Sequence, residues 1–136
     1  MSDAVRETLD RYYAALKAGD RAALRGVVSD DIEVHYPAPD GLLPWAGDWH
    51  GFAGFEAFLA TLADHLVIDR VEPLALHIAG DTAITVLKGE WTVKAGGRKV
   101  QTETVNIFTL RDGKIVRFQV HSDTAALGIG MGRLAA

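Results

Sequence analysis

The spacing of apolar residues differs between the two halves of the chain, and this difference limits the folds that it can adopt. Up to about residue 66, apart from a short strand and a loop, apolar residues recur at intervals of three and four, as they do on one face of a helix. From Ile68 onward they alternate with polar residues, as along a strand, and turn-forming pairs interrupt the alternation at Gly80-Asp81, Gly96-Gly97 and Asp112-Gly113. Helices followed by a strand meander predict the α+β class, a cone of three N-terminal helices packed on a curved antiparallel sheet.

Three helical segments are expected before the meander. The first has an apolar stripe that stops before Gly19, and Asp20 has the side chain to cap a short second helix. A short strand then stops at Pro37, and a long Gly/Pro-rich loop covers residues 37–50. A third amphipathic helix follows. The stripes of the first and third helices are formed by Val5, Leu9, Tyr12, Tyr13, Leu16, Phe52, Phe55, Leu59, Leu62 and Leu66.

The composition excludes several classes of function. With 136 residues, the chain is expected to form one domain, residues 1–136, that buries about 68% of the surface of the unfolded chain. A net charge of −4 gives no basic surface for nucleic acid or an anionic membrane, and the absence of cysteine excludes disulfides and thiolate chemistry. The sequence has neither a secretion signal nor an apolar run long enough to span a membrane, so a cytoplasmic location is expected.

Asn106 stands in a strand that is otherwise β-branched and apolar. A buried amide without a hydrogen-bond partner costs about 1–3 kcal/mol, so a partner in the protein or in a ligand is expected. If Asp112-Gly113 is a two-residue turn, the returning strand places Gln119 opposite Asn106. Alternation then brings four polar side chains to one face, beyond an apolar surface near the turn: Asn106, Gln119, His121 and Asp123. Such a face suits a pocket with a closed apolar bottom.

The opposite face of this hairpin is expected to be apolar. It is predicted to carry Val105, Ile107, Val116, Phe118 and Val120. No further helix is expected after Asp123 to cover these side chains, because the tail is short and rich in glycine. An exposed apolar patch of this kind is unusual on a monomer, so a two-fold homodimer packed sheet to sheet is expected.

Three stretches of the chain carry a resemblance to a known family. They are residues 11–20 (RYYAALKAGD), 29–32 (SDDI) and 111–115 (RDGKI). With the Gly/Trp loop, they resemble the nuclear transport factor 2-like superfamily, in particular its SnoaL-like and ketosteroid isomerase-like proteins, over nearly the whole chain. The superfamily also contains limonene epoxide hydrolases and polyketide cyclases. The resemblance implies the cone-shaped fold, and it indicates activity only weakly because this fold hosts many functions.

The resemblance also implies roles for individual residues. Tyr12 takes the place of the oxyanion-hole tyrosine of ketosteroid isomerase, and Asn106 takes the place of its protonated aspartic acid. Tyr36 stands where that enzyme has its base, and a phenol with a pKa of about 10 is a poor base at neutral pH. Asp123 resembles the acid/base aspartate of the polyketide cyclases, and His121 shares its expected face. The set would support proton abstraction beside a carbonyl group, with Tyr12 and Asn106 donating hydrogen bonds to the developing enolate.

The expected ligand is a small hydrophobic molecule with a carbonyl group, handled without a cofactor or a metal ion. Seven residues are predicted to line its pocket: Tyr36, Trp45, Trp49, Phe55, Leu87, Trp91 and Gln119. The register across Gly96-Gly97 places Trp91 on the face of Asn106 and places Gly89 opposite Thr104, where a glycine leaves room for a ligand.

A non-catalytic protein of the same fold is the alternative hypothesis. Such a module would hold a small apolar ligand, or would serve in dimerisation, without chemistry. Tyr12 and Asn106 would then be a packing residue and a fixed structural amide. The position of Asp123 separates the two hypotheses: burial beside His121 favours catalysis, whereas full exposure favours binding alone.

Overall fold

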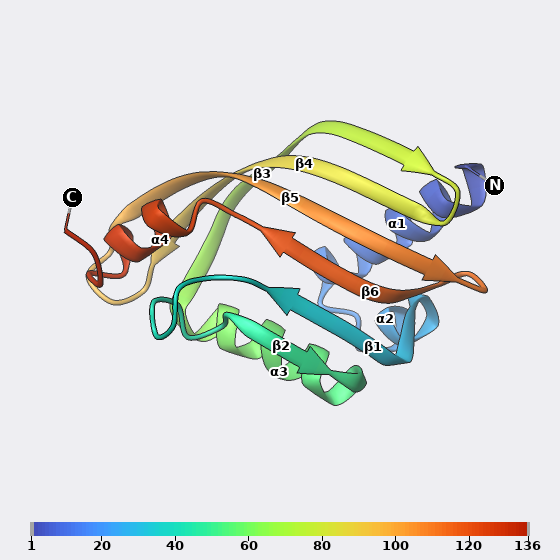
Figure 1. The fold of residues 1–136 in the computed structure, drawn as a ribbon, viewed down its shortest axis with the longest axis horizontal. Helices are drawn as coiled ribbons and strands as arrows, with labels where there is room; N and C mark the ends of the chain where they lie inside the picture. Colours follow the sequence, from blue (N-terminus) through green and yellow to red (C-terminus); the bar gives the residue numbers. More distant parts are fainter. Residues whose placement is uncertain (1, 136) are drawn as a thin grey trace.

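The structure, a computed structural model, describes residues 2–135. It has the α+β architecture predicted from the sequence, with helices on a curved sheet (Figure 1). The elements are α1 (Ser2–Ala18), α2 (Arg21–Val27), β1 (Val28–Tyr36), β2 (Gly47–His50), α3 (Gly51–His65), β3 (Leu66–Ala79), β4 (Thr82–Val93), β5 (Lys99–Arg111), β6 (Lys114–His121) and α4 (Thr124–Gly130).

The strands form one six-stranded sheet in the order β2-β1-β6-β5-β4-β3. Helices α1, α2 and α3 lie on one side of it (Figure 1). We call the side that faces them the inner face and the opposite side the outer face. All neighbouring strands are antiparallel except β1 and β6, which run parallel. The long connection through α3 and the β3–β5 meander makes this parallel pairing possible.

Two local predictions are confirmed and two are wrong. Asp20 caps α2, since its side chain accepts a hydrogen bond from the Ala23 N–H at 3.0 Å, and Gly19 ends α1 with a positive φ of 65°. The loop expected over residues 37–50 is shorter, because its last four residues pair with β1 as strand β2. The tail expected to lack a helix forms α4, whose glycines pack closely; a Cβ on Gly130 would lie 2.3 Å from Val100.

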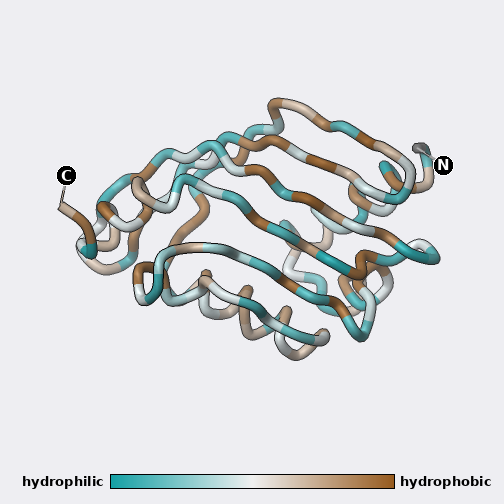
Figure 2. The backbone as a smooth tube through the Cα atoms, viewed as in Figure 1, coloured by the Kyte–Doolittle hydropathy of each residue, from teal (hydrophilic) through white to brown (hydrophobic). Residues whose placement is uncertain are grey.

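Aromatic side chains fill the space between the helices and the inner face. Phe108 of β5 stacks on Phe118 of β6, with ring centroids 5.0 Å apart, and Tyr12 of α1 packs edge-on against Phe108 at 5.4 Å. Phe55 of α3 approaches the same tyrosine ring at 6.3 Å. Buried and more exposed positions alternate along β5, which assigns one face of this strand to the core. Hydrophobic residues recur along the central strands (Figure 2).

A β-bulge in β6 makes the predicted register of the last hairpin wrong beyond its turn. Leu110 pairs with Ile115 as expected, but Thr109 pairs with Arg117, which leaves Val116 as an extra residue. An extra residue in one strand shifts its later side chains to the other face. Asn106 therefore lies opposite Val120 instead of Gln119.

The bulge exchanges the two faces of β6. Phe118 and Val120, expected outside, are buried in the core. Gln119 and His121 pair with Ile107 and Val105, so they lie on the outer face instead of beside Asn106. The expected shared face of Asn106, Gln119 and His121 is therefore wrong.

The outer face retains a smaller apolar patch than predicted, and this patch lies on β4 and β5. Val105 and Ile107 are on the outer face as expected, and they pair with Val86 and Ile84 of β4. We call these four half-buried residues the outer apolar patch.

Within residues 2–135, no helix is long and apolar enough to span a membrane.

Candidate functional site

Polar side chains follow the inner face of β5. Thr102, Thr104 and Asn106 occur at every second position, so all three point toward the helices, and all three are buried. We call them the inner polar row. The row begins where β5 passes the start of α4 and ends beside the aromatic core at Phe108. A buried polar row of this kind requires hydrogen-bond partners from neighbouring elements or from a ligand.

Asn106 meets Tyr13 of α1. Its amide Nδ2 donates to the Tyr13 hydroxyl at 3.1 Å, and that hydroxyl lies 3.0 Å from Thr85 Oγ1 of β4. Burial raises the pKa of Tyr13, and the hydrogen bonds with Thr85 and Asn106 lower it in part. The phenol is therefore neutral at physiological pH and is available as a donor or an acceptor.

The amide oxygen of Asn106 lacks a partner among the described residues, although Asn106 is only 6% exposed. A buried unpaired amide oxygen is costly, because it loses its hydrogen bonds to water without replacement. The interior beside Tyr13 thus offers one free hydrogen-bonding position. A ligand atom at this position would remove the cost.

The other end of the inner polar row forms a chain of hydroxyl groups. The Trp91 indole Nε1 donates to Thr102 Oγ1 at 3.0 Å. The Thr102 and Thr104 hydroxyls are 3.0 Å apart, and Thr104 lies 3.0 Å from the Ser122 hydroxyl. Because each hydroxyl both donates and accepts, the chain links the interior to the point where β6 leaves the sheet.

Tyr12 does not reach Asn106. Its ring is buried among Phe55, Phe108 and Phe118, and burial raises the pKa of its hydroxyl well above the ordinary value. The next residue along α1, Tyr13, supplies the hydroxyl that meets Asn106. The resemblance implied that Tyr12 and Asn106 face a common ligand oxygen. The structure instead places Tyr12 in the packing position that was its alternative.

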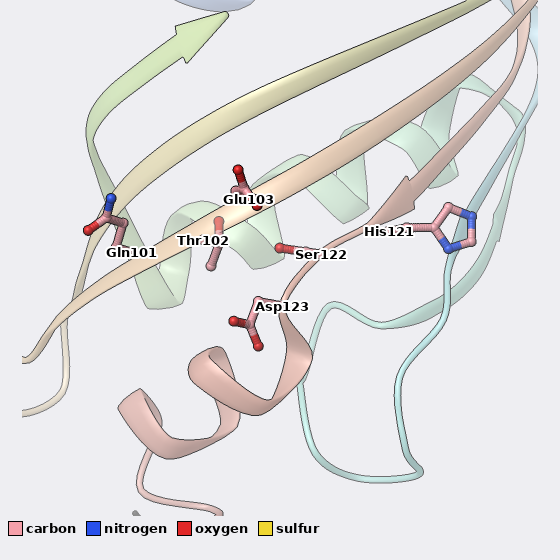
Figure 3. A pocket seen from close by; sticks show the side chains of 6 residues that line it. All are labelled: Gln101, Thr102, Glu103, His121, Ser122 and Asp123. Carbon is pink, nitrogen blue, oxygen red and sulfur yellow. The ribbon is translucent and has the colours of Figure 1, made fainter. Parts of the chain in front are cut away.

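His121, Ser122 and Asp123 border a hollow of about 550 Å³ between β5 and the start of α4 (Figure 3). Gln101, Thr102 and Glu103 of β5 form its other side. The hollow is open to solvent, and it reaches the hydroxyl chain at Thr102 and Ser122.

Asp123 is exposed at the rim of this hollow. Its side chain accepts a hydrogen bond from the Ala126 N–H at 3.0 Å and so caps α4. His121 points away from Asp123 (Figure 3). The two side chains therefore border one hollow without forming the buried pair on which the catalytic hypothesis depended.

His121 instead belongs to a polar group on the outer face. Its ring lies 6.4 Å from that of His35, and His35 Nδ1 is 2.6 Å from Asp48 Oδ1. The hydrogen bond with His35 lowers the pKa of Asp48. Within residues 2–135, no group of three or more His, Asp or Glu side chains is arranged to hold a metal ion.

The seven expected pocket residues occupy three kinds of position. Tyr36, Trp45 and Phe55 are buried in the aromatic core, and burial raises the pKa of Tyr36. Gln119 lies on the outer face, so its expected place in the pocket is wrong. Trp49, Leu87 and Trp91 are half-buried around the interior. The Trp49 indole donates a hydrogen bond to the Trp45 carbonyl at 3.1 Å.

Comparison with known proteins identifies the family. The family model of the SnoaL-like domain matches residues 9–118, which is most of the chain. The chain belongs to the SnoaL-like family. No curated protein matches it closely.

Solved structures of similar proteins agree with the assignment of this chain to the SnoaL-like family. A nuclear transport factor 2-like protein from Burkholderia xenovorans is 26% identical, with a TM-score of 0.86 over 94% of this chain and 95% of its own. TerC, co-crystallised with polyporic acid, is 25% identical, with a TM-score of 0.84 over 95% and 98%. A candidate isomerase from Rhodopseudomonas palustris shares the fold at 19% identity, with a TM-score of 0.81 over 93% and 97%.

Sequence reasoning missed the hydroxyl-bearing members of the candidate site in this SnoaL-like chain. Thr102 and Thr104 precede Asn106 at alternate positions, and this alternation was a readable signal for a polar row. Tyr13 lay on the recognised helical stripe, but the sequence did not separate it from Tyr12. Ser122 carried no signal, because the hairpin register that faces it inward depends on the bulge at Val116.

Proposed function

We propose that this SnoaL-like domain binds a small hydrophobic molecule at the inner face of its sheet and holds an oxygen atom of that molecule at Asn106. The observation that carries the proposal is the free atom of the Asn106 amide, buried beside the Tyr13 hydroxyl. Half-buried apolar residues, among them Leu87 and Trp91, lie on the same face of the sheet. Apolar walls with a few converging polar groups are typical of small-molecule sites.

The direction of the hydrogen bonds sets which oxygen the site accepts. With Nδ2 toward Tyr13, the free amide atom is an acceptor and suits a hydroxyl or enol. If the amide is reversed, the Tyr13 hydroxyl donates to the amide oxygen and Nδ2 is left to donate to a carbonyl oxygen. Either arrangement leaves one atom for the ligand, so the site suits a ketone or its enol.

A titration followed by NMR tests the binding proposal. TerC, a relative of this chain, was co-crystallised with polyporic acid, which is therefore the first probe. If binding is saturable, the side-chain amide signals of Asn106 should shift more than the backbone amide signals of outer-face residues that lie far from Asn106. Saturable binding that leaves the Asn106 side chain unmoved would contradict the placement of the ligand oxygen.

An isomerase or cyclase that works by acid/base catalysis without a cofactor is the second candidate function. It is favoured by the hollow that Asp123 and His121 border, because this hollow meets the hydroxyl chain at Thr102 and Ser122. One oxygen of the Asp123 carboxylate caps α4, which leaves the other to accept a proton from a substrate in the hollow.

Asp123→Asn is expected to abolish proton exchange if Asp123 is the base. Asparagine is as good an N-cap as aspartate, so the variant should retain α4 and lose only the carboxylate. The measurement is deuterium exchange next to the carbonyl group in a panel of enolisable cyclic ketones. Two results would argue against Asp123 as the base: equal exchange rates in the wild type and in Asp123→Asn, or the absence of exchange in every ketone that binds. Either result would leave binding without chemistry as the function.

A homodimer through the outer apolar patch is a further part of the proposal. Ile84, Val86, Val105 and Ile107 have no helix over them, since α1, α2 and α3 lie on the other side of the sheet (Figure 1). Ile107→Lys is expected to convert dimer to monomer without unfolding, because the lysine would be desolvated only in the dimer. Light scattering at micromolar concentration measures this. Gln101→Lys, on the same strand and face beyond the patch, is the control, and a monomeric wild type would end the dimer proposal.

A further inference from the structure

Among the tryptophans, tyrosines and phenylalanines of the described chain, Trp91 is the one whose ring has no aromatic neighbour. The other tryptophans, the tyrosines and the phenylalanines all pack in ring pairs, with centroids 5.0–6.4 Å apart. Trp91 is half-buried on the inner face of β4. Trp91 packs against the edge of the core, and the part of its ring that stays exposed offers contact area to a ligand.

Gly89 allows the Trp91 indole to lie across the sheet. A Cβ on Gly89 would lie only 2.5–2.7 Å from the indole atoms Cζ2, Cε2 and Nε1, so the ring occupies the place of a side chain at residue 89. The residue opposite Gly89 is Thr102, not Thr104 as predicted, and Thr102 Oγ1 accepts the hydrogen bond from Trp91 Nε1. Gly89 and Thr102 together hold the indole down against the strands.

Exposed aliphatic side chains surround this indole. Ile68 of β3 pairs with Trp91 and is 64% exposed, and Val71 pairs with Gly89 and is 40% exposed. Paired residues in antiparallel strands share a face, so both lie on the inner face beside the ring. On the other side of the indole is the hydroxyl chain of Thr102, Thr104 and Ser122. The result is an apolar surface with hydroxyl groups along one edge.

We infer that Gly89 and Trp91 form a stacking surface that selects ligands with a flat aromatic ring. This inference rests on the proposed binding function and specifies the chemical class of its ligand: a bicyclic aromatic ketone or phenol whose ring contacts Trp91 and whose oxygen points toward the inner polar row. Gly89 is a specificity-determining residue, because its lack of a side chain sets the position of the indole. Ile68 and Val71 extend the apolar contact beyond the ring.

Two ketones of the same skeleton test this selection. α-Tetralone has an aromatic ring, and α-decalone is its fully saturated counterpart. The measured quantity is the ratio of their dissociation constants, determined by NMR titration for each variant, so that the different hydrophobicity of the two ketones cancels. Trp91→Leu is expected to reduce the preference for α-tetralone about threefold to tenfold, the usual size of an aromatic pair contribution. Trp91→Phe, which keeps a ring, should restore part of it.

Gly89→Ala gives the sharper test, because the variant keeps a tryptophan at position 91 and changes only the position of the indole ring. The preference for α-tetralone should fall as in Trp91→Leu, and the near-UV circular dichroism of the indole should change. Gly26→Ala is the matched control, since a Cβ there meets no atom within 4 Å. Thr102→Val should lower the preference through the lost hydrogen bond from Nε1, and Thr102→Ser should restore it.

The outcomes separate this inference from the function on which it rests. If the wild type binds polyporic acid but neither ketone, the binding proposal stands and the stacking inference is overturned. If the wild type binds both ketones but Trp91→Leu weakens them equally, Trp91 is only an apolar wall and the inference alone is overturned. The inference is also overturned if the indole moves in Gly89→Ala but the preference for α-tetralone over α-decalone stays unchanged.

Discussion

Phe118→Ala is expected to lower the free energy of unfolding by about 3–5 kcal/mol, the usual cost of removing a buried phenylalanine side chain. Phe118 is buried on the inner face, its ring stacks on Phe108 at 5.0 Å, and it approaches Tyr12 at 6.1 Å. For a chain of this length the loss corresponds to a decrease in Tm of about 10–20 °C. Chemical denaturation measures the change in stability, provided that the free energy of unfolding depends on denaturant concentration with the same slope in both proteins.

The neighbouring residue provides the control. Gln119 follows Phe118 in β6 and lies on the outer face, so Gln119→Ala should change the stability by no more than about 0.5 kcal/mol. The pair tests the β-bulge at Val116 directly. Without the bulge, Phe118 would be on the outer face, and its loss would cost little. A small effect of Phe118→Ala together with a large effect of Gln119→Ala would reverse the assignment of the two faces.

Asn106→Leu is expected to weaken binding of polyporic acid by about fivefold to 150-fold while the protein stays folded. The range corresponds to the 1–3 kcal/mol cost of leaving a ligand oxygen unpaired in an apolar site. Leucine has the same branched arrangement of four side-chain heavy atoms as asparagine but a larger volume, and Tyr13 retains its hydrogen bond with Thr85. Removal of the unpaired amide oxygen should leave the free energy of unfolding unchanged or higher.

Thermal melting and ligand titration on the same samples separate the two roles of Asn106. Ile107→Leu, one position along β5 and on the outer face, is the control for small changes in the strand. Unchanged affinity in a folded Asn106→Leu variant would return Asn106 to a purely structural role. Lost stability with unchanged affinity would show that the amide serves the core of the protein.

Local patterns determined most of the fold. Gly19 and Asp20 mark the junction of α1 and α2, and Asp112-Gly113 forms the expected turn between Arg111 and Lys114. These signals are readable because a positive φ, a capping side chain or a periodic stripe involves only neighbouring residues. The family resemblance rested on the same stretches, and the SnoaL-like family model confirms it over residues 9–118.

The candidate site depended on contacts between distant elements. Tyr12 and Tyr13 are adjacent on one helical stripe, and only the angle at which α1 meets β4 and β5 brings Tyr13 to Thr85 and Asn106. Trp91 was placed correctly on the face of Asn106 although the predicted register of β4 and β5 was wrong by two residues, since Gly89 lies opposite Thr102 and not Thr104. A shift of two residues leaves every side chain on the same face, because side chains alternate with a period of two, whereas the single extra residue in β6 does not.

The sequence by itself determined the three N-terminal helices, the strand meander with its turns, and the polar character of Asn106 within an apolar strand, but not strand β2 or helix α4. The tertiary structure alone decided which residues share a face with Asn106. A single extra residue, Val116, moves Phe118 and Val120 inward and Gln119 and His121 outward. The physical reason is that side chains alternate with a period of two, so one bulge inverts every later position, and packing of Phe118 against Phe108 stabilises the inverted arrangement.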